Sequence, residues 1–226
     1  IAVIIQDGLR RMYEAKEDVY YYITVMNENY PHPEMPANVE RGILKGMYLF
    51  REGSRTEVAN SGLRVQLLGS GTILREVIAA AEILEREYGI AADIWSVTSF
   101  NELRREALDV TRWNMLHPAE PSKLPYVGTC LQGREGPVVA ATDYMKIFAD
   151  QIREFVPGRY KVLGTDGFGR SDTREKLRRF FEVDRYYVTI AALKMLAEEG
   201  SIPSEKVARA ISEFGIDPDK PNPVTV

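Results

Sequence analysis

The chain has 226 residues, enough for one large domain or for one domain and part of a second. Apolar residues make up 45% and charged residues 27% of the sequence, so the composition excludes a disordered chain. The net charge is −4 and like charges form no block, which argues against a nucleic-acid partner. No apolar run approaches the roughly 18 residues that span a bilayer, so no membrane partner is expected. A single cysteine, Cys130, indicates a reducing compartment, with the cytoplasm as the default.

The first 61 residues predict a helix, a buried strand and a linker. Apolar residues recur at helical spacing over residues 1–12, and the run over residues 19–26 is rich in β-branched and aromatic side chains. A chain that opens inside such a pattern is typical of a piece of a longer protein. Three prolines within residues 31–36 then predict a surface linker over residues 31–61, with a short ordered piece around residues 43–50.

From residue 62 onward, predicted strands alternate with predicted helices. The strands are expected at residues 65–68, 93–98, 137–141 and 160–163, and the intervening helices at residues 72–88, 101–114 and 144–155. This alternation predicts an α/β fold, a mostly parallel sheet with helices on both faces. The tail is expected to be helical, with Asp184 and Ser204 as N-caps. We therefore divide the chain into residues 1–30, the end of an upstream α/β domain, the linker 31–61, and a domain over residues 62–226.

Ligands of parallel sheets collect beyond the carboxyl ends of the strands, so the loops at those ends are the first places to look for a site. Gly69-Ser70-Gly71 starts like a phosphate-binding turn, but Leu74 replaces the third glycine of the dinucleotide fingerprint. A tight strand-to-helix turn is therefore the favoured interpretation. Asp143, which follows the third strand with Thr142, could be a functional carboxylate, although a helix N-cap is favoured for this pair.

The loop over residues 164–172, Gly-Thr-Asp-Gly-Phe-Gly-Arg-Ser-Asp, is the most informative segment of the chain. Its glycines allow backbone conformations that other residues avoid, while polar and aromatic side chains project around them. Asp172 and Glu175 fit a capping box for the next helix. Arg170 suits an anionic ligand or an ion pair across a domain or subunit contact, and we favour the contact. The interface or loop candidates are therefore Asp143, Asp166, Phe168, Arg170, Ser171 and Asp172.

The remaining reactive or aromatic side chains favour structural roles. His32 and His117 have no partner at metal-ligand spacing, and nothing marks Cys130 as an activated nucleophile. The basic patch at residues 174–179 is balanced by glutamates and predicts a solvated helix face. The aromatic residues Trp95, Trp113, Tyr20, Tyr21 and Tyr22 are expected in the core. The sequence thus assigns no catalytic, cofactor-binding or metal-binding residue.

Several segments resemble the C-terminal region of the first, decarboxylating component of the pyruvate dehydrogenase complex, in its single-chain homodimeric bacterial form. They are residues 21–24 with 27–30, and residues 66–71, 95–100, 112–118, 142–145 and 163–172. That family is similar in layout to transketolases. The resemblance therefore implies that residues 1–30 end a pyrimidine-binding domain and that residues 62–226 form a transketolase-like C-terminal domain.

The resemblance also implies a function for the full-length protein. Members of the family use thiamine diphosphate and magnesium to decarboxylate pyruvate oxidatively and to acetylate a lipoyl group of the dihydrolipoyl acetyltransferase component. No Gly-Asp-Gly followed by Asn occurs here, and no segment matches the glutamate that activates the cofactor, so both cofactors are expected to bind outside this segment. The segment itself is expected to be inactive and to serve dimer and domain packing.

Two alternative functions remain open at this level. The chain could be a stand-alone α/β module that binds a small anion or a nucleotide beyond the strand ends. It could also be the same region of a related 2-oxo acid dehydrogenase.

Overall fold

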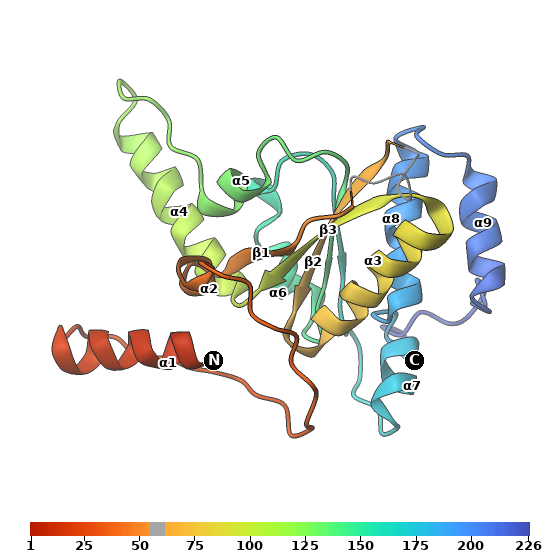
Figure 1. The fold of residues 1–226 in the computed structure, drawn as a ribbon, viewed down its shortest axis with the longest axis horizontal. Coiled ribbons are helices and arrows are strands. Elements are labelled where there is room, and N and C mark those ends of the chain that lie inside the picture. The colour runs from red at the N-terminus through yellow and green to blue at the C-terminus, as the bar shows by residue number, and fades with distance from the viewer. Residues whose placement is uncertain (55–61) are drawn as a thin grey trace.

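The computed structural model describes residues 1–54 and 62–226, and its centre is a five-stranded sheet (Figure 1). The strand order is β1-β3-β2-β4-β5. The pairs β2–β3, β2–β4 and β4–β5 are parallel, and β1 is antiparallel to β3 at one edge. The strands are β1 (Met47–Arg51), β2 (Arg64–Ser70), β3 (Ala91–Val97), β4 (Val138–Ala141) and β5 (Tyr160–Leu163). The predicted mostly parallel α/β sheet is confirmed.

Helices cover both faces of the sheet, as predicted. One face packs against α3 (Leu74–Tyr88), α8 (Arg185–Glu198) and α9 (Ser204–Glu213), which lie together in Figure 1. The other face packs against α4 (Phe100–Leu116), α5 (Tyr126–Leu131) and α6 (Lys146–Asp150). Because both faces are buried, the central strands are mostly apolar, and all seven residues of β3 are buried, the polar Asp93 and Ser96 included.

Shorter elements complete the fold. A 3-10 turn over Gly71–Ile73 leads from β2 into α3, and another over Arg153–Phe155 follows α6. The helix α7 (Arg174–Phe180) precedes α8. At the N-terminus α1 (Ala2–Leu9) continues into a π-helical turn over Arg10–Glu14 and lies beside α2 (Glu40–Lys45) (Figure 1).

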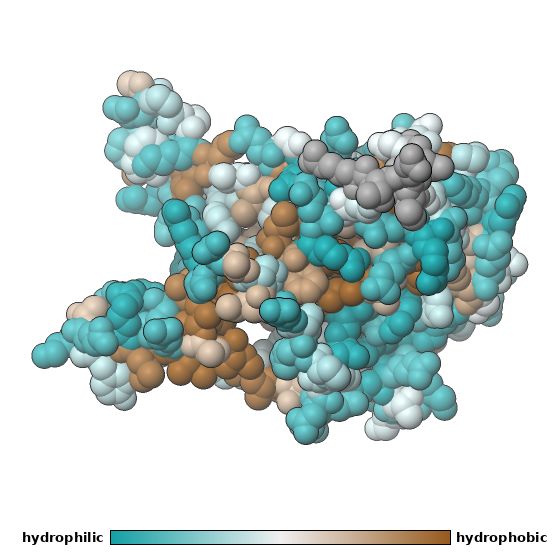
Figure 2. Space-filling model, in the orientation of Figure 1, coloured by the Kyte–Doolittle hydropathy of each residue, from teal (hydrophilic) through white to brown (hydrophobic). Residues whose placement is uncertain are grey.

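The predicted buried strand over residues 19–26 is wrong. These residues form no ladder with the described part of the chain, and Tyr20 and Tyr22 are 88% and 86% exposed. Tyr21 is held, because its ring lies against Gly8 and its hydroxyl donates to Asp7, and Thr24 accepts the Tyr144 hydroxyl. An extended segment buries its side chains only against a neighbouring element, and the described residues supply none for the two outer tyrosines. Figure 2 shows apolar surface along this N-terminal segment.

The expected linker over residues 31–61 contains part of the sheet itself. The ordered piece predicted around residues 43–50 corresponds to α2 and to β1, whose Met47 is fully buried. The sequence did not reveal its place in the sheet, because its antiparallel partner β3 lies more than 35 residues along the chain. Residues 55–61 of the expected linker lie outside the described residues, and the division into domains stays a prediction.

The N-caps were predicted with mixed success. Asp184 caps α8 as expected, since its carboxylate accepts the backbone N–H groups of Tyr186 and Tyr187, both at 3.0 Å. Thr173 rather than Asp172 caps α7, so the predicted capping box is wrong. Ser204 is the first residue of α9 and not its cap. Adjacent Ser, Thr and Asp residues carry the same capping signal, so a shift of one position is invisible in the sequence.

The helix predicted over residues 144–155 is also shorter than expected. It is divided into α6 and the second 3-10 turn, with the fully buried Ile152 between them. Met145 stands at the N-cap of α6 and offers no side-chain oxygen, so capping by Thr142 or Asp143 is wrong. The two predicted caps lie too far upstream because the chain turns sharply at Tyr144 before α6 begins.

Candidate functional site

The part of the molecule where a parallel sheet would place a site is the edge at the carboxyl ends of β2, β4 and β5. We call residues 70–72, 142–146 and 164–172 the carboxyl edge. The chain leaves β2 for β3 on one side, while β4 lies on the other side of β2, so the topological switch point falls between β2 and β4. Gly69 pairs with Ala141 there, which brings the two following loops together.

Direct contact closes the switch point between these two loops. The Ser70 hydroxyl donates to the buried Thr142 hydroxyl at 2.8 Å, and the backbone N–H of Tyr144 donates to the same Thr142 oxygen at 3.2 Å. A Cβ at Gly69 would lie 2.8 Å from the Leu74 Cα, so only glycine lets the strand approach α3 this closely. These contacts support the tight-turn interpretation of the Gly69-Ser70-Gly71 segment.

Asp143 lies half-buried at this edge. Burial raises the pKa of its carboxyl group, although its own backbone N–H and the Arg178 charge oppose the rise. Its backbone carbonyl accepts the Thr165 hydroxyl at 2.5 Å, which connects the loops after β4 and β5. Asp143 is therefore a carboxylate with a perturbed pKa near the switch point, as a site candidate should be.

Asp166 has a structural role that the sequence did not reveal. Its carboxylate accepts the backbone N–H of Lys146 at 2.9 Å and lies 3.8 Å from the Lys146 ammonium group. Lys146 is the first residue of α6, so Asp166 supplies from a distance the cap that Met145 cannot provide. Gly164 permits this contact, because a Cβ there would lie 2.7 Å from the Tyr144 carbonyl oxygen.

The other four candidates lie along the exposed end of the same loop. Phe168 is 79% exposed, and the Arg170 guanidinium lies over the Phe180 ring, 5.0 Å from its centroid. The Asp172 carboxylate accepts the backbone N–H of Thr173 at 2.7 Å, and Ser171 is exposed. The structure therefore brings Asp143 and Asp166 to the carboxyl edge but gathers no single site from all six candidates. An intermolecular contact for Arg170 stays a prediction.

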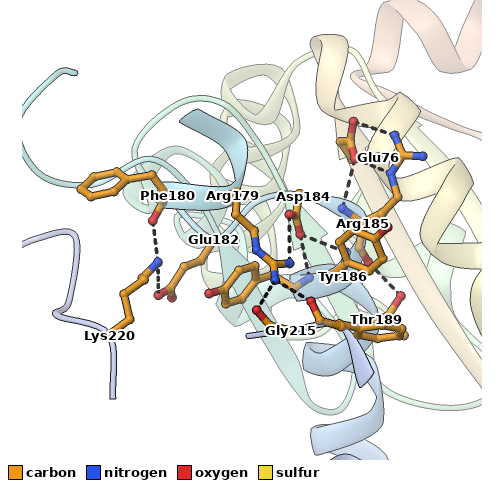
Figure 3. Close-up of polar contacts among 12 residues, drawn as sticks. Glu76, Arg179, Phe180, Glu182, Asp184, Arg185, Tyr186, Thr189, Gly215 and Lys220 are labelled. Atoms are coloured by element: carbon orange, nitrogen blue, oxygen red, sulfur yellow. Dashed lines mark hydrogen bonds and ion pairs between the residues drawn. The ribbon is translucent and has the colours of Figure 1, made fainter. Parts of the chain in front are cut away.

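A buried glutamate that the sequence analysis passed over organises the region next to this edge. Glu76 on α3 is 5% exposed and accepts the Arg185 backbone N–H at 3.1 Å and its side-chain Nε at 2.9 Å (Figure 3). Arg178 of α7 approaches the same carboxylate at 3.4 Å. Burial alone would raise the pKa of Glu76, but the hydrogen bonds and charge of Arg185 outweigh it and leave the pKa lowered.

The basic patch on α7 is only partly the solvated face that was predicted, since the Lys176 side chain is 71% exposed but the arginines bind within the fold. Arg178 has a side chain only 15% exposed, because it reaches Glu76. Arg179 donates to the carbonyl oxygens of Phe214 and Gly215 at 2.6 and 3.0 Å and pairs with Asp184 (Figure 3). The prediction failed because it weighed only the nearby glutamates, whereas the partners of these arginines lie on α3 and at the ends of α8 and α9.

The opposite edge of the sheet, at the amino ends of the strands, holds a second buried carboxylate. Asp93 is fully buried at the start of β3 and accepts hydrogen bonds from Gly53, Arg64 and Gln66 at 2.8, 2.5 and 2.9 Å. Arg134 lies 3.4 Å away. The Gln66 amide oxygen in turn accepts the Trp95 indole N–H at 2.9 Å. This network joins β2, β3 and the chain after β1.

The remaining reactive side chains show no chemical constellation. His117 stacks on Trp113, with ring centroids 4.3 Å apart, and its Nδ1 lies 2.8 Å from the Trp113 carbonyl oxygen. Burial raises the pKa of Cys130 and keeps it a thiol. Within residues 1–54 and 62–226, no group of three or more His, Cys, Asp and Glu side chains could hold a metal ion. No helix in the same ranges is long and apolar enough to cross a membrane.

Two family models match parts of the chain. The family described as transketolase-like TK C-terminal domain matches residues 46–184, and the family described as pyruvate dehydrogenase E1 component middle domain matches residues 1–33. Among solved structures, a transketolase from Leishmania mexicana matches with a TM-score of 0.47 and 17% identity, over 73% of this chain and 20% of that chain.

Curated relatives match along nearly the whole sequence. The pyruvate dehydrogenase E1 component of Cupriavidus necator is 63% identical over all of this chain and 25% of its own length. The proteins of the same name from Pseudomonas aeruginosa and Escherichia coli K12 are 60% and 55% identical over 99% of this chain and 25% of theirs. The chain thus spans about a quarter of the length of these relatives. It belongs to the transketolase-like C-terminal domain family and corresponds to the C-terminal part of bacterial proteins named pyruvate dehydrogenase E1 component.

Proposed function

We propose that this chain serves as the C-terminal part of a thiamine-diphosphate-dependent pyruvate dehydrogenase E1 component. The carrying observation is the 63% identity, over the whole chain, to a protein of that name. The longer protein would decarboxylate pyruvate oxidatively and acetylate a lipoyl group of a dihydrolipoyl acetyltransferase. A cytoplasmic location is part of the proposal and rests on the single unpaired cysteine.

The role we propose for this segment is structural. The carboxylates of Asp166 and Glu76 already have partners within the fold, since Asp166 binds the start of α6 and Glu76 binds the start of α8. The direct Ser70–Thr142 hydrogen bond joins the loops at the switch point, where a stand-alone nucleotide or anion module would need room for its ligand. The alternative of an independent binding module therefore finds no support there.

Thiamine diphosphate and magnesium do not fit the described residues. A diphosphate and its metal need a cluster of carboxylate or amide ligands with free basic groups nearby. The described ranges hold no acidic cluster of metal-binding size, and Arg178 and Arg185 are occupied by Glu76. We therefore propose that both cofactors bind to parts of the longer protein outside these residues, and we assign no chemical step to this chain.

Packing in a homodimer is the second part of the proposed role. Several large apolar side chains on α6 and the loop before it remain exposed, as expected of a surface that another element covers. They are Tyr144 at 44%, Met145 at 51%, Ile147 at 62% and Phe148 at 36% exposed. With the exposed Phe168 and Arg170 of the neighbouring loop, they form the surface that we expect to contact another domain or subunit.

Two measurements on two proteins test the proposal, calorimetry for cofactor binding and an assay of pyruvate decarboxylation. The 226-residue chain should show no saturable thiamine diphosphate binding and no pyruvate decarboxylation, whereas a protein with the full length of the relatives should show both when magnesium is present. Turnover by the 226-residue chain alone would refute the structural role. Absence of decarboxylation from the full-length protein would refute the enzyme assignment.

A further inference from the structure

The segment over residues 27–31 lies against α3 and α7, and arginine side chains of both helices contact it. Arg75 in the first turn of α3 donates to the Pro31 carbonyl oxygen at 3.0 Å. Arg174 at the start of α7 donates to the Asn27 side-chain oxygen at 2.5 Å and forms an ion pair with Glu28. A stretch without helix or strand is thereby attached to two helices that follow it in the chain, α3 and α7.

Tyr30 is the centre of this contact. Its ring lies near two guanidinium groups, 4.8 Å from Arg75 and 5.7 Å from Arg178, measured to the ring centroid. Arg178 also donates to the Tyr30 hydroxyl at 3.1 Å, and that hydroxyl donates to the Glu28 carboxylate at 2.8 Å. The same hydrogen bond lowers the pKa of Glu28, so the carboxylate stays ionised beside Arg174. Cation–π attraction and hydrogen bonding therefore act on Tyr30, and hydrogen bonding and ion pairing act on Glu28.

Arg178 extends the contact into the interior. The same guanidinium that touches Tyr30 lies 3.4 Å from the buried Glu76 carboxylate, which in turn binds the first residue of α8, Arg185. Because Glu76 is fixed by its other bonds, Arg178 is presented to Tyr30 in a restricted orientation. Arg178 is therefore held by the five-stranded domain as well as by Tyr30, and a side chain that is already held loses less entropy on binding.

The contact also joins two parts of the chain that match different family models. Tyr30 falls within residues 1–33, which match the middle-domain family, while α3 and α7 fall within residues 46–184, which match the C-terminal-domain family. Within the described residues, the hydrogen bonds and ion pairs that leave residues 24–31 go to α3, to α7 or to Tyr144.

We propose that Glu28 and Tyr30 form a latch that fixes the N-terminal segment to the five-stranded domain, and that α3 and α7 form a binding surface for an acidic, tyrosine-bearing extended peptide. The chain's own residues 27–31 occupy that surface. The latch sets the position of residues 1–26 relative to the sheet. This inference is independent of the enzymatic proposal, because it concerns contacts within the 226 residues.

Distances between two spin labels test the latch. Labels attached to Tyr22→Cys, before the latch, and Glu205→Cys, on α9, in a Cys130→Ser background should give one narrow distance distribution. Combining Glu28→Ala with Tyr30→Ala should broaden that distribution at least twofold, whereas Glu34→Ala, at an exposed position beyond the latch, should leave it unchanged. Circular dichroism on each variant confirms that the five-stranded domain stays folded.

Two results would overturn the inference. One is an unchanged narrow distribution in the folded Glu28→Ala, Tyr30→Ala variant, since the segment would then be held by other contacts. The other is a parent protein whose distribution is already as broad as that of the variant. Raising the salt concentration of the folded parent to 1 M should also broaden its distribution, because screening weakens ion pairs at the surface.

Discussion

The two edges of the sheet each hold a buried carboxylate among arginines, but they use it differently. At the amino edge, Asp93 binds partners from strands and from the loops directly attached to them, and it is fully enclosed. Near the carboxyl edge, Glu76 binds Arg185 at the start of α8 and Arg178 in the last turn of α7, and Arg178 is shared with the N-terminal segment. The carboxylate at the amino edge therefore links strands and their loops to one another. The carboxylate near the carboxyl edge links helices to the N-terminal segment.

The largest expected effect tests the amino edge. Asp93→Asn removes the charge that compensates Arg64 and Arg134 and leaves these guanidinium groups without their buried partner. We expect a loss of about 3–5 kcal/mol in the free energy of unfolding, measured by urea denaturation. Asp109→Asn, at an exposed position, is the matched control and should change stability by less than about 0.5 kcal/mol. A loss below about 1 kcal/mol for Asp93→Asn would show that the amino edge does not depend on this charge.

The carboxyl edge should respond less to the corresponding change. Glu76→Gln is expected to cost about 2–3 kcal/mol, since Arg185 is partly exposed and water can solvate its freed guanidinium. Glu82→Gln on the same helix, with a side chain 58% exposed, is the control. If Glu76→Gln cost as much as Asp93→Asn, the distinction between the two edges would fail.

The loss of unfolding free energy in Glu76→Gln should depend on pH. The pKa of Glu76 is lowered below the ordinary value of 4.5, so its ionised form stabilises the fold above that pH. This contribution should disappear as the pH falls through the lowered pKa. The difference in unfolding free energy between the parent and Glu76→Gln should therefore shrink on acidification, and a constant difference would contradict the pKa direction.

A steric change sharpens the comparison at the switch point. Gly69→Ala would place a methyl group 2.8 Å from the Leu74 Cα, a backbone atom that cannot move without shifting α3. We expect a loss of about 2 kcal/mol, which is typical of overpacking. Gly169→Ala offers a matched control in the exposed loop, because a Cβ there meets no heavy atom within 4 Å. Equal thermal midpoints for the two variants would mean that the strand and α3 do not require their close approach.

The smallest expected effect concerns Asp143. Burial raises its pKa above 3.8, so the folded protein disfavours the ionised carboxyl at neutral pH and is relatively stabilised as the pH falls through the raised value. Asp143→Asn should remove that penalty and increase stability at pH 7 by about 1 kcal/mol or less. Urea denaturation at pH 4 and pH 7 measures the effect, with Asp109→Asn as the control. A destabilised variant at pH 7 would show that the ionised carboxylate is needed at the carboxyl edge.

Much of the fold could be predicted because buried helices and strands show characteristic patterns of apolar residues in the sequence. The strands around Val65, Ile94 and Val139 are buried on both faces, so each is rich in apolar residues. The same reasoning failed over residues 19–26, since composition specifies a tendency to extend and not the presence of a partner strand. It also missed the edge strand β1, because its pairing with β3 is not local.

The candidate site could be located but not assembled from the sequence. Strand ends indicate where loops meet, and Asp143 and Asp166 do lie at the carboxyl edge. The carboxylates that organise their surroundings, Glu76 and Asp93, were missed because each stands within an apolar stretch and looks like an interruption of it. Their partners, such as Arg185, lie far away in the sequence, and no spacing rule connects residues that meet only in the folded state.

The antiparallel direction of β1 has a mechanical consequence. Its start at Met47 lies beside Val97 at the carboxyl end of β3, and its end at Arg51 lies beside Ile94. Two residues after Arg51, the backbone N–H of Gly53 binds Asp93. β1 is therefore a strut that runs along β3 from its carboxyl end toward the polar network around Asp93, with a bulge between Leu49 and Arg51. Deleting Tyr48, which lies ahead of the bulge, should turn side chains on one side of the deletion to the wrong face or pull Gly53 away from Asp93. Length changes in residues 32–38, which form neither helix nor strand, would move neither anchor of that strut.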